Sequence, residues 1–283
     1  MLKRFILTGL VLGFSLSLFS QVNPDTLPEK YVPKVIIEAK WGNGPGEFGF
    51  KPDSEIPPDG IGPCGLTISD NKIYILDAVN RRINVYSTNG SFARTIKLKG
   101  KGMRLLFFNP GFTALRRDKE GNFYLLGYWE KAGQEILKFD STGNFMTVVF
   151  RSPSDKEGYR IEFGPYLEVK GDSLILRASE GLTKKGPTLF YINRNTKDVI
   201  IENAKKKARE EKEFYYYPKY PKCLKEKESL PNEIKNFVLY SRDFSQVLGA
   251  KSYDTNGNFY ELLWSPCKYH NMGVKVLKWE RIR

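Results

Sequence analysis

The chain has 283 residues, of which 41% are hydrophobic, and its formal net charge is +13 at pH 7. This length is enough for one substantial hydrophobic core or two small ones. A single histidine and three widely spaced cysteines exclude a recognisable zinc-binding motif. The positive charge either favours anionic partners or belongs to a lysine-rich surface that keeps the protein in solution.

Residues 1–20 have the layout of a secretory signal peptide, with Lys3 and Arg4 ahead of an apolar run that ends at Phe19. The run is shorter than the roughly 20 apolar residues that span a membrane, and no later segment is apolar enough to do so. No cysteine follows it that could carry a lipid. We therefore expect cleavage after Ser20 and a secreted or periplasmic protein without a transmembrane segment. Such a protein would not meet nucleic acid inside the cell, so we expect a protein, an acidic polysaccharide or another anionic surface as its partner.

Residues 34–41 favour a β-strand, and the glycines that follow, Gly44, Gly46 and Gly49, have the spacing of a dinucleotide-binding turn. That turn must lead into a helix whose N-terminus faces the phosphates. Residues 51–63 contain four prolines instead, and proline disrupts helix interiors. We therefore expect no bound cofactor, and we interpret the glycines as a turn into the first repeat.

The rest of the chain repeats a unit of two hairpins. The first hairpin has four copies, of which the second and fourth share Asp-x-x-Gly-Asn-Phe-Tyr: residues 68–77, 118–126, 169–178 and 254–263. The second hairpin follows in residues 83–98, 136–150 and 189–202. Asp, Asn and Gly are the residues that such turns favour. Four-stranded units of about 40 residues predict an all-β fold, the β-propeller, in which each blade packs on its neighbours.

The number and closure of the blades follow from where the units begin, near Leu66, Phe112, Tyr166 and Gly249. Four antiparallel blades are recognisable, and the chain has room for up to six. The last unit ends after its third strand. Residues 33–41 would supply the fourth strand, closing the ring non-covalently and leaving no bare edge. Residues 203–248, rich in lysine and tyrosine, are a degenerate blade or an insertion within one domain, residues 21–283.

The stretch "WGNGPGEF", followed by "YILDAVNRRINVYSTNGSF", resembles the NHL-repeat family of β-propellers. The likeness is close over residues 41–98 and weaker beyond them. Propellers of this family often have six blades, so the likeness implies a protein similar to six-bladed propellers. The matching residues of the second and third strands are Asp77, Asn80, Arg82, Ile83, Val85 and Tyr86. We expect Asp77, Asn80 and Arg82 to have a structural role, because an Asp and an Arg on adjacent strands can pair and hold the loop between them.

In a propeller, the loops between the second and third strands share one face with the connections between blades, which we call the loop face. Lysines there can hold anionic groups, and aromatic rings can stack on sugars. The candidate ligand-binding residues are Arg81, Tyr128, Trp129, Lys131, Lys184, Lys185, Tyr216, Lys219, Lys268 and His270. The alternative is that these are ordinary loop residues and that the tyrosines pack the 203–248 segment onto the ring.

The three cysteines also fall on the predicted loop face. A disulfide between Cys223 and Cys267, or between Cys64 and Cys267, is geometrically conceivable, and the alternative is that all three stay unpaired. An odd number of cysteines leaves at least one without a partner in the chain.

Three hypotheses for function follow. The favoured one is a binding or scaffolding module for an anionic ligand or protein on the loop face. A metal-assisted hydrolase or lyase using calcium or zinc is less favoured, because His270 and Cys267 supply fewer ligands than a zinc site needs. We therefore assign no catalytic, cofactor-binding or metal-binding residues. The third hypothesis is a structural envelope protein without a small ligand.

Overall fold

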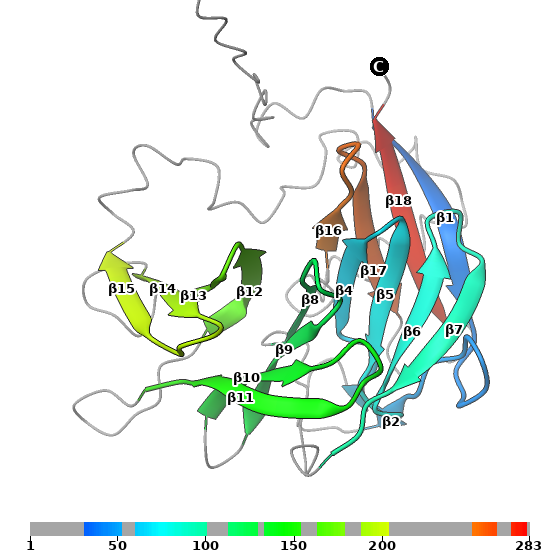
Figure 1. The fold of residues 1–283 in the computed structure, drawn as a ribbon. Coiled ribbons are helices and arrows are strands. Elements are labelled where there is room, and N and C mark those ends of the chain that lie inside the picture. The colour runs from blue at the N-terminus through cyan, green and yellow to red at the C-terminus, as the bar shows by residue number, and fades with distance from the viewer. Residues whose placement is uncertain are drawn as a thin grey trace, which may run out of the picture.

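The computed structural model describes residues 31–52, 60–100, 113–129, 133–153, 163–178, 188–203, 251–264 and 273–281. The regular structure in these ranges is β-strand. It forms four antiparallel sheets of four strands, arranged as the blades of a β-propeller, and one two-stranded sheet (Figure 1). The predicted fold class is therefore confirmed.

The four blades follow the repeat units of the sequence. The first blade contains β4 (Gly65–Ser69), β5 (Lys72–Asp77), β6 (Arg82–Ser87) and β7 (Phe92–Lys97). The second contains β8 (Ala114–Arg117), β9 (Phe123–Trp129), β10 (Gly133–Phe139) and β11 (Phe145–Arg151). The third contains β12 (Phe163–Lys170), β13 (Ser173–Ala178), β14 (Thr188–Asn193) and β15 (Val199–Asn203). The closing blade contains β16 (Lys251–Tyr253), β17 (Phe259–Trp264), β18 (Val274–Arg281) and β1 (Tyr31–Ala39).

The closing blade takes its outer strand from the N-terminal part of the chain, as the sequence predicts. Strand β1 pairs antiparallel with β18 from Tyr31 opposite Arg281 to Ala39 opposite Val274. It begins and ends two residues earlier than the predicted 33–41, and Trp41 instead forms an isolated bridge with Phe48. A short ribbon follows, in which β2 (Lys51–Pro52) pairs with β3 (Gly60–Ile61).

The hydrophobic core lies between the blades. Successive side chains of a strand point to opposite faces of its sheet, so they pack against the blades on either side. Leu76, Leu125 and Phe139 belong to the cluster between the first and second blades. Two further clusters fill the boundaries between the second and third blades and between the closing and first blades. Burying one such side chain contributes about 1.5–3 kcal/mol, so packing between blades holds the ring together.

Turns of one blade also rest on the outer strand of the blade before it. A Cβ atom on Gly90, in the β6–β7 turn, would lie 1.7 Å from the carbonyl oxygen of Ile36 in β1. A Cβ atom on Gly143, in the β10–β11 turn, would lie 2.3 Å from the carbonyl oxygen of Lys97. Both glycines have positive φ, so each position needs glycine for conformation and for space.

The repeated Asp-x-x-Gly-Asn pattern forms the same polar turn in two blades. Asp254 Oδ1 accepts a hydrogen bond from the backbone of Asn258 at 2.9 Å, and its Oδ2 accepts one from the Tyr260 hydroxyl at 2.9 Å. Asp118 bonds Asn122 and Tyr124 in the same way. The second-strand tyrosine thus anchors the turn to the core.

Several expectations concern residues outside those that the structure describes. They are the signal peptide, residues 1–20, and nearly all of the 203–248 segment. Within the described ranges, no helix has the length and apolar character needed to cross a bilayer.

Candidate functional site

On the loop face of the first blade, a buried ion pair organises the polar side chains. Asp77 ends β5 and is fully buried. Its Oδ2 accepts hydrogen bonds from Arg82 Nε at 2.8 Å and Asn80 Nδ2 at 2.9 Å. Its Oδ1 accepts bonds from the backbone N–H groups of Gly49 at 3.1 Å and Asn80 at 3.3 Å. The carboxylate therefore has four donors and fixes the loop between β5 and β6.

The same arginine holds the glycine-rich segment that enters the blade. Arg82 Nη1 donates to the carbonyl oxygen of Asn43 at 2.6 Å, and Nη2 donates to that of Glu47 at 2.8 Å. The Tyr86 hydroxyl donates to the carbonyl oxygen of Gly46 at 2.8 Å. These bonds connect β6 to residues 42–49, which follow the closing strand. Arg82 thus connects the segment that follows the closing strand β1 to the first complete blade.

The glycine segment is also closed on itself. The backbone N–H of Gly44 donates to Glu47 Oε2 at 2.8 Å. A Cβ atom on Gly49 would lie 2.7 Å from the side chain of Val79, so this position needs glycine to pack against the β5–β6 loop. The N–H groups of Gly44 and Gly49, which a phosphate cradle would point at its ligand, bond protein carboxylates here.

Of the ten candidate ligand-binding residues, three lie in the described part of the chain. Arg81 is exposed, adopts a φ of 50°, and stands beside the buried Arg82. Tyr128 and Trp129 end β9, where they pair with Gln134 and Gly133. Outside the described residues lie Lys131, Lys184, Lys185, Tyr216, Lys219, Lys268 and His270.

Cys64 is free and buried in the core between the first and second blades. Burial raises the pKa of its thiol well above the ordinary value. The pairing of Cys64 with Cys267 stays a prediction, and Cys64 is unpaired with any other cysteine in the described part of the chain. Cys223 and Cys267 lie outside the described residues.

The second blade uses different side chains at the equivalent positions. Glu135 stands opposite Gly127 where the first blade pairs Arg82 with Asp77. Its buried carboxylate accepts a bond from Arg151 Nε at 2.7 Å. Gln134 donates from Nε2 to the carbonyl oxygen of Phe163 at 2.8 Å, and its Oε1 accepts from the N–H of Phe163. This amide links the second blade to the start of the third, and the sequence analysis did not identify it.

The opposite face contains the hairpin turns between the first and second strands and between the third and fourth, and we call it the hairpin face. Arginines cross two blade boundaries there. Arg117 of the second blade bonds Ser69 and Asp70 of the first, and its guanidinium lies 5.1 Å from the centre of the Tyr74 ring. Arg194 of the third blade reaches the second. Neither arginine was recognised as an inter-blade link from the sequence.

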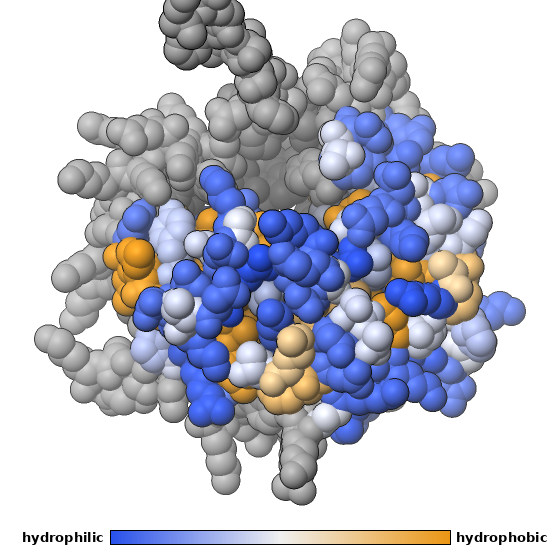
Figure 2. All heavy atoms as spheres, in the orientation of Figure 1, coloured by the Kyte–Doolittle hydropathy of each residue, from blue (hydrophilic) through white to orange (hydrophobic). Residues whose placement is uncertain are grey.

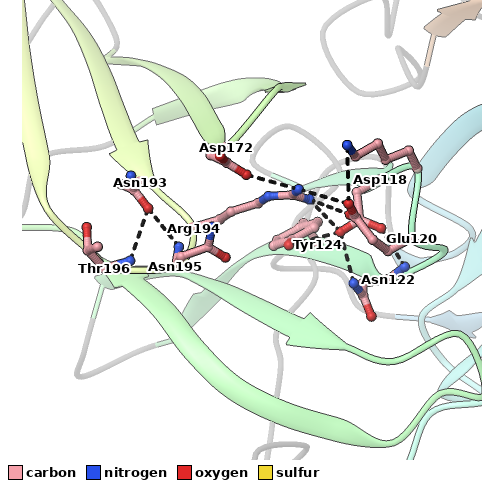
Figure 3. Close-up of polar contacts among 10 residues, drawn as sticks. Asp118, Glu120, Asn122, Tyr124, Asp172, Asn193, Arg194, Asn195 and Thr196 are labelled. Atoms are coloured by element: carbon pink, nitrogen blue, oxygen red, sulfur yellow. Dashed lines mark hydrogen bonds and ion pairs between the residues drawn. The ribbon is translucent and has the colours of Figure 1, made fainter.

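Arg194 lies at the centre of a carboxylate cluster that Figure 3 shows. Its Nη1 atom is 2.7 Å from Asp118 Oδ2 and 2.9 Å from Glu120 Oε2. Its Nη2 atom is 3.3 Å from Asp172 Oδ1 in the β12–β13 turn of its own blade. One buried guanidinium therefore ties the β14–β15 turn to the β8–β9 turn.

The charges in this cluster perturb one another. Burial acts to raise the pKa of Asp118, but hydrogen bonds from Asn122 and Tyr124 hold it below its ordinary value. Burial, and next the charge of Asp118, raise the pKa of the Tyr124 hydroxyl to about 12. Bonding to Glu120, the largest influence, raises the pKa of Arg194. The Asp118 carboxylate is therefore ionised and bonded to the arginine at neutral pH, which suits a structural link.

Among the residues that the structure describes, no three His, Cys, Asp or Glu side chains are arranged to hold a metal ion. The charged groups described above are buried ion pairs, such as that of Asp77 with Arg82, and exposed single charges, such as Arg81.

Comparison with known proteins gives only remote similarity. No family model and no curated protein matches this chain. Among solved structures, a luciferin-regenerating enzyme is 18% identical over 44% of this chain and 39% of its own, with a TM-score of 0.29. A glutaminyl cyclase from Myxococcus xanthus is 12% identical over 77% of this chain and 73% of its own, with a TM-score of 0.31. A streptogramin B lyase is 10% identical over 89% of this chain and 98% of its own, with a TM-score of 0.30. At these values, neither activity nor ligand carries over to this chain.

Proposed function

We propose that this chain is a secreted, NHL-like β-propeller that acts as a binding or scaffolding module, with an anionic ligand or an acidic protein held on the loop face. The proposal is supported by the different environments of two adjacent arginines. Arg82 is buried and consumed in holding the segment of residues 42–49, whereas Arg81 is exposed. A fixed loop presenting an unburied charge is pre-organised for binding.

The NHL part of the proposal rests on what the matching residues do. Asp77, Asn80 and Arg82 bond one another and the glycine-rich segment before the blade. The two stretches of sequence that carry the resemblance are therefore in contact. A motif with that structural role supports a similar fold, but it carries no information about activity.

The anionic nature of the ligand rests on charge. The formal net charge of +13 falls to +11 when Lys3 and Arg4 are removed with the signal peptide (13 − 2), and it still produces a field that attracts anions before contact. Such attraction is screened beyond about 8–10 Å at physiological salt. Binding driven by it should therefore weaken as salt is raised, whereas binding to a neutral sugar through aromatic stacking should not.

The test uses a sulfated polysaccharide, anionic phospholipid vesicles and their neutral counterparts, at low and high salt. We expect the wild-type protein to bind at least one anionic probe, with affinity falling at high salt, and Arg81→Glu to weaken that binding by about tenfold. Lys72→Glu is the matched control, because it makes the same charge change at an exposed residue on the hairpin face. Equal losses in the two variants, or no binding to any anionic probe at low salt, would refute the proposal.

A further inference from the structure

The third blade carries apolar side chains on both of its faces. Leu176 and Phe190 pack into the cluster shared with the second blade. Because successive side chains of a strand point to opposite faces of its sheet, Ile175, Leu189 and Tyr191 lie on the other side, where they form a separate small cluster. Ile175 and Leu189 are each only 5% exposed. We call this side the far face of the third blade.

The far face of the third blade continues onto its edge strand, β15. Ile200 stands opposite Tyr191 and is 63% exposed. Figure 2 shows the apolar patch that lies over β15. The outer end of this far face therefore reaches the surface, whereas its centre, at Ile175 and Leu189, is covered.

The closing blade has a far face of the same kind. Leu262 and Val276 stand opposite each other and pack towards the first blade. Leu263, Leu277 and Trp279 alternate with them along β17 and β18, so they point away from the first blade. All three are at most 1% exposed, yet none of them belongs to the clusters that join the described blades. Packing between the described blades therefore does not account for the burial of this far face.

The two far faces border the same interval of the ring. The inner strands β4, β8 and β12 lie side by side in that order, and β16 lies beside β4. No comparable contact joins β12 to β16 among the described strands, so the third and closing blades are the two ends of the described ring (Figure 1). Two buried apolar faces that border one interval indicate that further chain lies between them.

The connectivity favours one segment as that further chain. Residues 204–250 run from the end of β15 to the start of β16, so they link the two blades that carry the far faces. The shorter loops 179–187 and 265–272 leave β13 and β17 at the loop face. Trp279 stands opposite Phe259 at the hairpin face, roughly 16 Å farther along the closing blade. Its burial is therefore better explained by the longer segment.

The composition of this segment indicates which part of it fits an apolar interval. Residues 204–229 are rich in charged residues and tyrosine, whereas residues 230–248 include Leu230, Ile234, Phe237, Val238, Phe244 and Leu248. We propose that residues 230–248 dock between the far faces of the third and closing blades and join them. Charged side chains buried there without partners would cost free energy, so the apolar half is the part that docks. The segment is then part of the ring, and its docking does not depend on an anionic ligand at the loop face.

Photo-crosslinking of the full chain tests where the segment lies. Tyr191 is replaced by the photoreactive residue p-benzoylphenylalanine, which keeps an aromatic ring on the far face of the third blade. After irradiation and digestion, we expect mass spectrometry to find cross-links to residues 230–248. The same replacement of Met146, which is 52% exposed on the outer strand of the second blade, is the control and should give none. Cross-links from position 191 to residues 21–30, to another segment or to a second copy of the chain would overturn the proposal.

Hydrogen exchange tests whether the far faces depend on the segment. Phe237→Asp and Phe244→Asp each place a charge in the apolar interval, so the backbone amides of β14 and β18 should exchange at least about tenfold faster than in the wild type. Amides of β5 should be unaffected. Leu224→Asp makes the same kind of change in the charged half of the segment and should stay within about threefold of the wild type.

If an aspartate variant fails to fold by circular dichroism, Phe237→Ala takes its place, and the same strands should exchange faster than in the wild type because the interval loses apolar contacts. Wild-type exchange in β14 and β18 of every folded variant would refute the docking, as would an equal acceleration by Leu224→Asp.

Discussion

Replacing Arg82 by alanine should remove a large share of the stability of the ring. The change deletes bonds at 2.8 Å to Asp77, 2.6 Å to Asn43 and 2.8 Å to Glu47. It also leaves the fully buried Asp77 carboxylate without its cation. Breaking a buried ion pair from one side costs about 3–5 kcal/mol, against a total stability of about 5–15 kcal/mol for a typical domain. Urea denaturation followed by tryptophan fluorescence should show a midpoint lower by about 1–2 M.

The neighbouring Arg81→Ala provides the control, because Arg81 is exposed and its removal should change stability by no more than about 0.5 kcal/mol. Adding Asp77→Asn to the Arg82→Ala chain should recover part of the loss, because it neutralises the unpaired buried charge. If Arg82→Ala is no more damaging than Arg81→Ala, or if Asp77→Asn deepens the loss, the ion pair does not hold the segment as argued.

Four further predictions follow from other contacts. Arg194→Met should lower the free energy of unfolding in urea by about 3 kcal/mol, because the buried Asp118 loses its cation; a change under about 0.5 kcal/mol would contradict this. Hydrogen bonds hold the pKa of Asp118 below 3.8 despite its burial. Its contribution to the free energy of unfolding is therefore complete above pH 3.8 and is lost as the pH falls through the pKa of the folded state. Acid unfolding of Asp118→Asn should be less steep over that pH range. Gly90→Ala should lower the Tm by at least about 2–4 °C more than Gly257→Ala, because both have positive φ but only Gly90 lacks space for a Cβ atom; equal Tm values would refute the clash. Cys64 should resist iodoacetamide at pH 8 in the folded protein and react in urea, as read by mass spectrometry of its peptide, because burial raises its pKa; rapid labelling of the folded chain would show that the core admits solvent.

The fold could be predicted from the sequence where the determining interactions are local. Asp254, Asn258 and Tyr260 lie within seven residues and form one turn, so a repeated pattern reveals a repeated structure. The closing strand was also predictable, because a blade with three strands leaves an edge that needs a partner. The observed strand begins and ends two residues earlier than predicted, because pairing with β18, and not strand propensity, determines where β1 stops.

The polar links between blades could not be predicted, because their partners are distant in sequence. Arg194 and Asp118 are 76 residues apart, and no pattern in either segment indicates the other. The burial of Cys64 depends equally on how the first two blades pack. The side chain of Gln134 bonds the backbone of Phe163. The repeat does not signal this link, because Arg82 of the first blade holds the segment before its own blade and not the one after it.

The pairing of β1 with β18 also sets an order of events in folding. The other three blades each draw their strands from one continuous stretch of chain, whereas this blade joins Tyr31 to Arg281. Contacts so distant in sequence carry a large loop-closure entropy and form slowly. We expect the three local blades to assemble first and the ring to be joined last. Until then β18 offers a bare strand edge to any other chain, so the interval before joining is when the protein is most exposed to aggregation.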